Sequence, residues 1–261
     1  MARNLVARAS LVKQFSLREI QGRYRGSFLG VFWALVTPLL MLGVFTFVFT
    51  EIFQSVWPGT TGKVDFALYL FAGMVAYNLF AEVASGTPRL IVGNPNFVKK
   101  VVFPLEVLPL AQVGSALIHS LMSLTILIIA KLVFHQSLSW TILLLPLVYL
   151  PLLALSAAVG WVLASLGVFL RDIGNLVAVV VQLLFFLSPI TYPTSNVPEA
   201  VRPLMWLNPF ATIIDAFRAV VIQGVMPQWG PLLIVTALSL LAAVLGYAWF
   251  MKIKRAFPDV I

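Results

Sequence analysis

Long uncharged apolar runs alternate along this chain with short polar segments, most of which carry Lys or Arg. The first run is uncharged from 28 to 50, and a helix needs about 20 apolar residues to cross the hydrocarbon core of a bilayer. Drawn with their flanks, the apolar runs predict spans at about 28–53, 66–84, 107–134, 144–170, 173–188 and 231–251. The pattern therefore predicts an all-α integral membrane protein with six transmembrane helices.

Composition supports this class. The 261 residues are 61% hydrophobic and only 10% charged, whereas soluble domains are about 25% charged. The predicted spans consume nearly all of the length, so we expect one membrane domain over 1–261 and no separate globular module. The chain has no cysteine, which excludes a disulfide framework and a cysteine metal site.

The N-terminal 26 residues are polar and basic, with six Lys or Arg against the single acid Glu19. Gln14, Arg18, Gln21 and Arg25 fall on one helical face, which predicts an amphipathic helix lying in the membrane interface. The alternative is a topology signal with no other role. Gly26 and Ser27 would break this helix from the first span.

A proline-rich segment follows the fifth span, with five prolines between Pro189 and Pro209. The next stretch, 211–223, is too short to cross a membrane. Its apolar side chains share one helical face, and Asp215 and Arg218 form an i,i+3 pair expected on the other. Together these features predict a re-entrant segment between spans five and six.

Six spans place both termini on one side of the membrane. That side carries 13 of the basic residues and the other carries Lys63, Lys131, Arg202 and Arg218. The positive-inside rule therefore predicts a multi-pass membrane protein with both termini in the cytoplasm.

No catalytic constellation is visible, because the acidic residues are scattered near span ends without metal-ligand spacing. A glycine-rich turn before 64 misses the phosphate-binding motif at Trp57 and Val64, so we expect no nucleotide site and no bound cofactor on this chain. His119 lies inside the third span, where a helix-packing hydrogen bond is favoured over a proton relay.

Four stretches resemble one family in the right order: RYRGSFLGVFWALVTPLL, NPNFVKKVVFPLEVLP, LRDIGN and LSPITYPTSNVPEAVRPLMWLNPFATIIDAFR. They are similar to the transmembrane permease subunits of type 2 ABC exporters for bacterial polysaccharide, which include O-antigen, capsule and teichoic-acid exporters. The block from SPITYP to NPF is most like the O-antigen branch, which belongs to lipopolysaccharide biosynthesis.

The resemblance implies a homodimer bound to two copies of a cytoplasmic ATPase, which would hold ATP and Mg²⁺. It implies a transport subunit without its own ATPase site, and a lipid-linked polysaccharide as the substrate. Two loops would dock on the ATPase as coupling segments. Their residues would be Asn94, Phe97, Lys99, Lys100 and Phe103 in one loop and Arg171 and Asp172 in the other, whose shortness leaves little to form a docking helix.

The resemblance also implies an entrance and an exit for the substrate. The entrance would involve Arg23, Tyr24, Arg25 and Trp33, with the two arginines meeting a pyrophosphate linker. The translocation path or outer gate would involve Phe185, Phe186, Tyr192, Asp215 and Arg218. Two alternatives remain open: a type 2 permease for a drug or lipid, and a membrane enzyme that modifies glycans.

Overall fold

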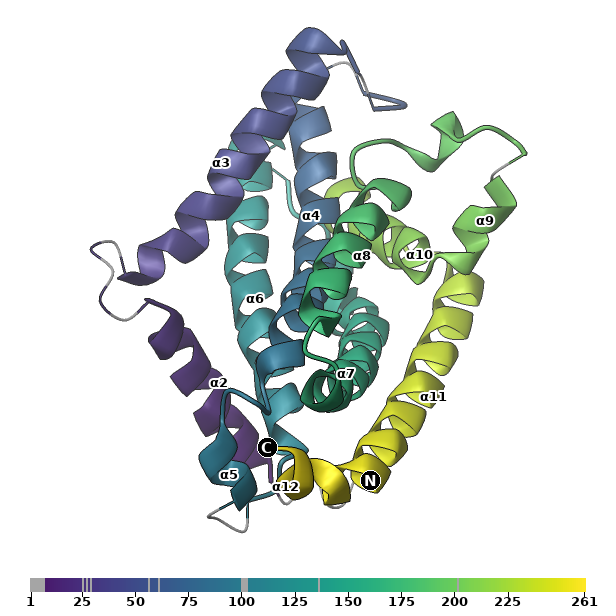
Figure 1. Ribbon diagram of the computed structural model, residues 1–261. Coiled ribbons are helices and arrows are strands. Elements are labelled where there is room, and N and C mark those ends of the chain that lie inside the picture. The colour runs from purple at the N-terminus through teal and green to yellow at the C-terminus, as the bar shows by residue number, and fades with distance from the viewer. Residues whose placement is uncertain are drawn as a thin grey trace.

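The computed structural model of the chain describes residues 8–24, 26, 28, 30–55, 57–60, 62–99, 103–135, 137–200 and 202–261, without the side chains at 23, 24, 31, 203, 204 and 206. Every regular element in these residues is a helix (Figure 1). The all-α expectation is confirmed. Five helical segments are long and apolar enough to cross a membrane: Trp33–Ile52, Lys63–Arg89, Val107–His135, Trp140–Phe169 and Trp229–Val260.

Most of these segments combine an α-helix with a short turn of another helical type. They comprise α3 (Trp33–Phe47) with the π-turn η2 (Val48–Ile52), α4 (Lys63–Gly86) with η3 (Thr87–Arg89), α6 (Val107–His135), η4 (Trp140–Leu144) with α7 (Leu145–Phe169), and α11 (Trp229–Ile253) with η7 (Lys254–Ala256) and α12 (Phe257–Val260).

The expected fifth span is α8 (Ile173–Leu187), an apolar helix of 15 residues. At about 1.5 Å per residue it extends about 22 Å, which is less than the roughly 30 Å of a hydrocarbon core. Five described segments are therefore long enough to cross the membrane. α8 by itself is too short to form a sixth crossing.

The remaining elements are short. They are α2 (Ala9–Tyr24), η1 (Gly30–Phe32), α5 (Pro95–Lys99), η5 (Thr194–Asn196), α9 (Arg202–Leu207), α10 (Pro209–Arg218) and the π-turn η6 (Ala219–Gln223). The first long helix begins at Trp33, later than the expected 28. Gly26 and Gly30 have φ of 82° and 51°, which interrupts a right-handed helix, so α2 and α3 are separate. Ser27 lies outside the described residues.

The core forms around α4, which is buried along most of its length and contacts α6, α7, α8 and α10. A second tight packing joins α11 to α7. A Cβ at Gly246 of α11 would lie 2.7 Å from the Ala158 carbonyl oxygen, so only glycine allows this approach, as in other small-residue helix contacts. In contrast, α3 buries only Ala34.

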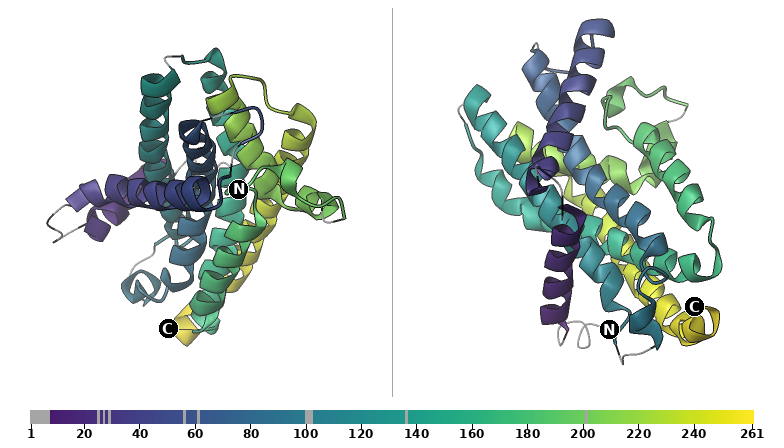
Figure 2. Two further views of the ribbon diagram at one scale, coloured as in Figure 1. Left: turned by 90° about the horizontal axis from the view of Figure 1, so that it is seen from above. Right: turned by 60° about the vertical axis from the view of Figure 1, so that its left-hand side comes forward.

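The two ends of the molecule carry different elements. α2, α5 and α12 gather at one end, which we call the α5 end, whereas the top of α3, the loop after it and the η5–α9 segment lie at the opposite, α9 end (Figures 1 and 2). α10 lies in the α9 half. This arrangement separates the predicted coupling residues from the predicted outer gate.

The turn η6 is held by neighbouring polar side chains. Lys131 Nζ donates to the Val221 carbonyl oxygen at 2.8 Å, and Thr141 Oγ1 donates to the Val220 carbonyl oxygen at 2.8 Å. A helix C-terminus offers unpaired carbonyls and a partial negative charge. Lys131, which is buried, therefore stabilises the end of the α10–η6 segment.

Candidate functional site

The first predicted coupling loop contains the short helix α5, which begins with Pro95 and ends with Lys99. Asn94 precedes it, and its Nδ2 donates to the Leu90 carbonyl oxygen at 2.9 Å. Lys99 Nζ donates to the carbonyl oxygen of Ile261 at 2.5 Å, so the C-terminal residue is attached to α5. Lys100 lies outside the described residues.

An aromatic cluster joins α5 to the N-terminal helix. The Phe97 and Phe103 rings stack with centroids 4.6 Å apart, and Phe15 of α2 lies 5.1 Å from Phe103 and 5.6 Å from Phe97. Such ring pairs are each worth about 0.5–1.5 kcal/mol beyond the area they bury. These contacts pack α5 and the loop after it against α2.

Glu106 connects three more segments at the same end. Its side chain is 2% exposed and forms ion pairs with Arg8, before α2, and with Lys254 in η7, the latter at 3.0 Å. Its carbonyl oxygen accepts a hydrogen bond from Trp161 Nε1 of α7 at 3.1 Å. A buried carboxylate is stable only when it is paired, so these contacts tie the end of the coupling loop to both termini of the described chain.

The second predicted coupling loop is the exposed turn of Arg171 and Asp172 between α7 and α8. Its flanks lie against η3. A Cβ at Gly167 would overlap the Pro88 carbonyl oxygen, and one at Gly174 would lie 3.8 Å from Arg89 Nε. The two coupling loops therefore adjoin through η3, which leads from α4 toward α5.

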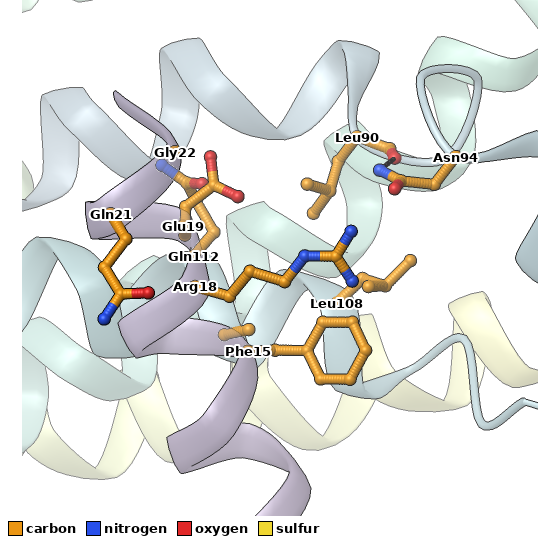
Figure 3. Close-up of a pocket in the computed structure, with 10 residues that line it drawn as sticks. Phe15, Arg18, Glu19, Gln21, Gly22, Leu90, Asn94, Leu108 and Gln112 are labelled. Atoms are coloured by element: carbon orange, nitrogen blue, oxygen red, sulfur yellow. Dashed lines mark hydrogen bonds between the residues drawn. The ribbon is translucent and has the colours of Figure 1, made fainter. Parts of the chain in front are cut away.

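A cavity of about 510 Å³ opens between α2, the loop at 90–94 and the start of α6 (Figure 3). Arg18 extends into it, with its guanidinium 5.8 Å from the centre of the Phe15 ring. Glu19, Gln21, Asn94 and Gln112 add polar lining. Arg18, which is predicted to lie on the polar face of the interface helix, thus lines this cavity.

The predicted entrance residues are only partly placed. The side chains of Arg23 and Tyr24 and all of Arg25 lie outside the described residues. Trp33 is exposed at the start of α3. It lines a different cavity, between α3, α4 and α6.

The predicted outer-gate residue Arg218 is buried, with its side chain 2% exposed. The expectation that it lies on a polar face of α10 opposite the apolar residues is wrong. Its guanidinium donates to three carbonyl oxygens, those of Tyr69 at 3.0 Å, Pro189 at 2.6 Å and Ile190 at 2.8 Å. These acceptors satisfy its donors inside the protein, so burial is possible.

Two further groups complete the surroundings of Arg218. The Trp57 ring centre lies 4.3 Å from its Cζ, a cation–π contact. Asp215 Oδ1 lies 3.6 Å from Nη1, so the predicted i,i+3 pair is present. The first part of the Pro-rich segment, α4 and the loop before it are thereby held to α10.

The predicted path aromatics gather on α8 and its neighbours. Phe185 stacks on Phe45 of α3 at 5.8 Å and meets Tyr77 of α4 edge-on at 5.5 Å. The hydroxyl of Tyr77 donates to the Val181 carbonyl oxygen. Phe186 is exposed, and Tyr192 Oη donates to its carbonyl oxygen at 3.1 Å.

Sequence reasoning missed one polar contact between spans. His119 Nδ1 of α6 lies 3.0 Å from both carboxylate oxygens of Glu82 of α4. The helix-packing hydrogen bond expected for His119 is present, but its acidic partner was not anticipated. Both residues stand out as titratable groups inside predicted spans, and that signal pointed to them.

The described residues contain no group of three or more His, Cys, Asp or Glu that could hold a metal ion. The polar side chains described above instead form hydrogen bonds and ion pairs between segments.

Comparison with known proteins gives a consistent result. A model of the family described as "ABC-2 type transporter" matches residues 10–222. That match covers all the helices from α3 to α10 and nearly all of α2.

Curated relatives match almost end to end. An O-antigen export system permease protein, RfbA, of Myxococcus xanthus is 28% identical over 100% of this chain and 99% of its own length. A permease of the same name from Klebsiella pneumoniae is 25% identical, covering 94% of this chain and 92% of its own length. The polysialic acid transport protein KpsM of Escherichia coli is 21% identical over 94% of each chain.

Proposed function

Because the chain belongs to the ABC-2 type transporter family, we propose that it is the membrane-spanning subunit of an ATP-driven exporter of bacterial polysaccharide. The observation that carries this proposal is the similarity to an O-antigen export permease along the full length of both chains. The five apolar segments of membrane length agree with a multi-pass permease. An O-antigen-like chain is the proposed cargo.

ATP hydrolysis would take place on a separate partner. The sequence departs from a phosphate-binding loop at Trp57 and Val64, and we assign ATP and Mg²⁺ to two copies of a cytoplasmic ATPase. The ATPase would dock at the α5 end, on α5 and on the turn of Arg171 and Asp172. The aromatic cluster around Phe97 supports this, because it gives a rigid route from α5 to α2.

Two permease chains would form the membrane unit. α3 and α8 leave large apolar side chains uncovered in the single chain, among them Val44, Phe47, Leu183 and Leu187. Lipid covers some such surface in any membrane protein, but a homodimer that encloses a passage would cover it with the second copy. The stacked Phe45 and Phe185 rings lie at this boundary between α3 and α8.

The proposed orientation of the chain in the membrane follows from the distribution of its Lys and Arg residues. We propose that the chain lies in the bacterial inner membrane and crosses it six times, with α8 as the fifth crossing. The α9–α10–η6 segment would be re-entrant and face the periplasm, and both termini would lie in the cytoplasm. α2 would then lie at the cytoplasmic interface. A lipid-linked glycan would enter beside α2, past the arginines at 23 and 25, and leave past the segment that Arg218 holds.

Deleting the gene tests the function. The deletion strain should lack the polysaccharide at its surface and accumulate it inside, and a co-expressed tagged chain should co-purify an ATPase. Normal surface polysaccharide together with increased sensitivity to a drug would instead establish the drug-permease alternative. Glycan that is exported but chemically altered would establish the enzyme alternative.

The proposed entrance has its own test. Arg23→Ala combined with Arg25→Ala should reduce export while leaving the amount of permease in the membrane unchanged, because two cations that meet the pyrophosphate linker are removed. The matched control is Lys252→Ala, which removes a cation from α11. Normal export by the double variant would remove the linker role.

A further inference from the structure

After α11 the chain turns across the α5 end of the molecule instead of continuing along the axis of that helix (Figure 1). The three-residue turn η7 and the four-residue helix α12 form this segment. A helix of about one turn is not stable by itself in water. The position of α12 therefore depends on the contacts that it makes with the rest of the chain.

α12 contacts both of the loops that are proposed to dock on the ATPase. Ile261, directly after α12, accepts the hydrogen bond from Lys99 Nζ of α5 at 2.5 Å. On the other side, the Phe257 ring lies 6.1 Å from the ring of Phe169, the last residue of α7, which stands two residues before Arg171. α12 therefore adjoins α5 and the end of α7 at the same time.

Two further contacts attach this segment to the bundle. Phe257 is fully buried, and its ring meets that of Phe250 on α11 edge-on at 5.6 Å. Lys254 Nζ of η7 donates to Glu106 Oε2 at 3.0 Å. Because α12 is held by α5, α7 and α11, it is a packed part of the α5 end.

Two tryptophans on α11 indicate the level of α12 relative to the membrane. Trp229 and Trp249 are 38% and 44% exposed, and the 20 residues between them correspond to about 30 Å of helix. That distance equals the thickness of a hydrocarbon core, and tryptophan is enriched at both of its surfaces. Lys252, Lys254 and Arg255 follow Trp249, as basic residues follow a span on its water side. α12, which comes after them, therefore lies outside the hydrocarbon core.

The exposed side of α12 has the composition of a protein contact. Val260 is 51% exposed, and Leu170, beside the second loop, is 54% exposed. The neighbouring Asp259, Lys99 and Arg171 are exposed charged residues. Apolar side chains with charged residues around them are the usual arrangement of a protein–protein interface.

The size of the two loops leaves room for a third element. α5 has five residues, and the second loop is a turn of two exposed residues, Arg171 and Asp172. A specific interface of standard size uses about 20–30 residues on each side. A partner that binds both loops therefore needs further surface, and α12 provides surface that adjoins both.

We propose that α12 is a third docking element for the partner ATPase, which contacts the exposed Asp259 and Val260 when it binds the two loops. The inference rests on the proposed function, because it takes the ATPase as the partner. Within the permease, the buried Phe257 and the hydrogen bond from Lys99 hold α12 in place for this contact.

Photo-crosslinking tests the contact directly. A photoreactive amino acid replaces Val260 in the full-length chain, which is co-expressed with the ATPase that co-purifies with it, and adducts are identified by mass spectrometry. We expect an adduct between permease and ATPase. The control position is Val225, a valine of equal exposure, 50%, in the loop at the other end of α11. A probe there should give at least about tenfold less ATPase adduct.

A charge substitution tests the same surface. Val260→Asp should reduce ATPase co-purification about tenfold, since an apolar contact is lost and an unpaired carboxylate is placed in the interface. The amount of permease in the membrane should stay unchanged, because Val260 is exposed. Val225→Asp makes the same change away from α12 and should retain the ATPase. Equal co-purification by Val260→Asp and the unchanged chain would overturn the proposal.

The outcomes separate this proposal from the proposed function. A probe at Asn96, which is exposed on α5, serves for comparison. ATPase adduct at 96 with none at 260 would mean that the ATPase docks on α5 without α12. An adduct at 260 that contains only phospholipid, or a second permease chain, would also overturn the role of α12. If no ATPase co-purifies with the unchanged chain, the proposed exporter function itself is wrong.

Discussion

The guanidinium of Arg218 is the most extensively satisfied polar group in the part of the chain that the structure describes. It donates to three carbonyl oxygens on two segments and also lies over the ring of Trp57. Each buried carbonyl left without a donor costs about 1–3 kcal/mol. The residue therefore holds the chain at Pro189 and Ile190 to α4 and α10 more strongly than an exposed ion pair would.

Replacing this arginine by lysine keeps the charge and removes the planar fork of donors. Arg218→Lys should lower the unfolding free energy by about 2–4 kcal/mol, because at least one carbonyl loses its partner. Thermal unfolding of the purified permease in detergent measures this. Arg202→Lys is the control, since Arg202 is exposed and makes one 3.3 Å contact with a carbonyl. Equal melting temperatures for the two variants would contradict the clamp.

At the scale of elements, helix pairs are set by close approaches and aromatic contacts. α11 meets α7 where Gly246 faces the Ala158 carbonyl oxygen, and α5 meets α2 through Phe15, Phe97 and Phe103. The contact between α11 and α7 leaves no room for a side chain larger than glycine at 246. The contact between α5 and α2 lies where the ATPase is proposed to bind.

A larger side chain at the α11–α7 contact has no room. Gly246→Leu should lower the unfolding free energy by about 1–3 kcal/mol through overpacking, seen as a lower melting temperature and less folded protein in the membrane. Gly230→Leu is the matched change on the same helix, where a Cβ meets nothing within 4 Å. A stable Gly246→Leu protein would mean that the helices do not approach as described.

Charge reversal on α5 tests its proposed role in docking the ATPase. Lys99→Glu with Lys100→Glu should reduce ATPase co-purification about tenfold, since a reversed charge at an interface repels the partner's complementary patch. Lys63→Glu, at the opposite end of the molecule, should retain the ATPase. Pull-down and export by the double variant that match the unchanged chain would show that α5 is not a docking element.

Sequence patterns predicted the helices better than the contacts between them. Apolar runs locate α4, α6 and α11 because membrane length is a strong constraint. Helical spacing also placed Ile213, Ile214 and Phe217 on one buried face, and all three are fully buried. By contrast, spacing along α10 put Arg218 on the polar side, because its acceptors belong to segments about 30 and 150 residues away.

The pairing of Glu82 with His119 escaped prediction for the same reason. The two residues are 37 positions apart, and only the packing of α4 against α6 brings them together. Likewise, the attachment of Ile261 to Lys99 joins residues 162 positions apart. Local periodicity carries no information about such distances.

At the scale of the whole molecule, the single chain leaves much of its apolar surface without a protein neighbour. α3 and α8 expose large side chains along their length, while α4 is enclosed. In the proposed dimer, the second copy of the chain would cover the exposed faces of α3 and α8, and lipid would cover the exposed faces of the other helices.

The absence of cysteine from the sequence permits a direct test of the dimer. Val44→Cys on α3 should form a disulfide-linked dimer in membranes under mild oxidation, because the proposed interface brings α3 close to the second copy. Leu241→Cys on α11 is equally exposed and should remain monomeric on a non-reducing gel. Crosslinking at 241 but not at 44 would place the interface on the other side.

The way Arg218 is bound has a consequence for how the chain at Pro189 and Ile190 tolerates change over evolution. All three acceptors of its hydrogen bonds are main-chain atoms, which every residue type supplies. These hydrogen bonds therefore do not depend on which side chains stand at 189 and 190, although both residues are buried, whereas an added or deleted residue there would shift the acceptors out of reach. We therefore expect that a change in the length of this segment breaks the hydrogen bonds of Arg218 even where the replaced side chains still fit the core.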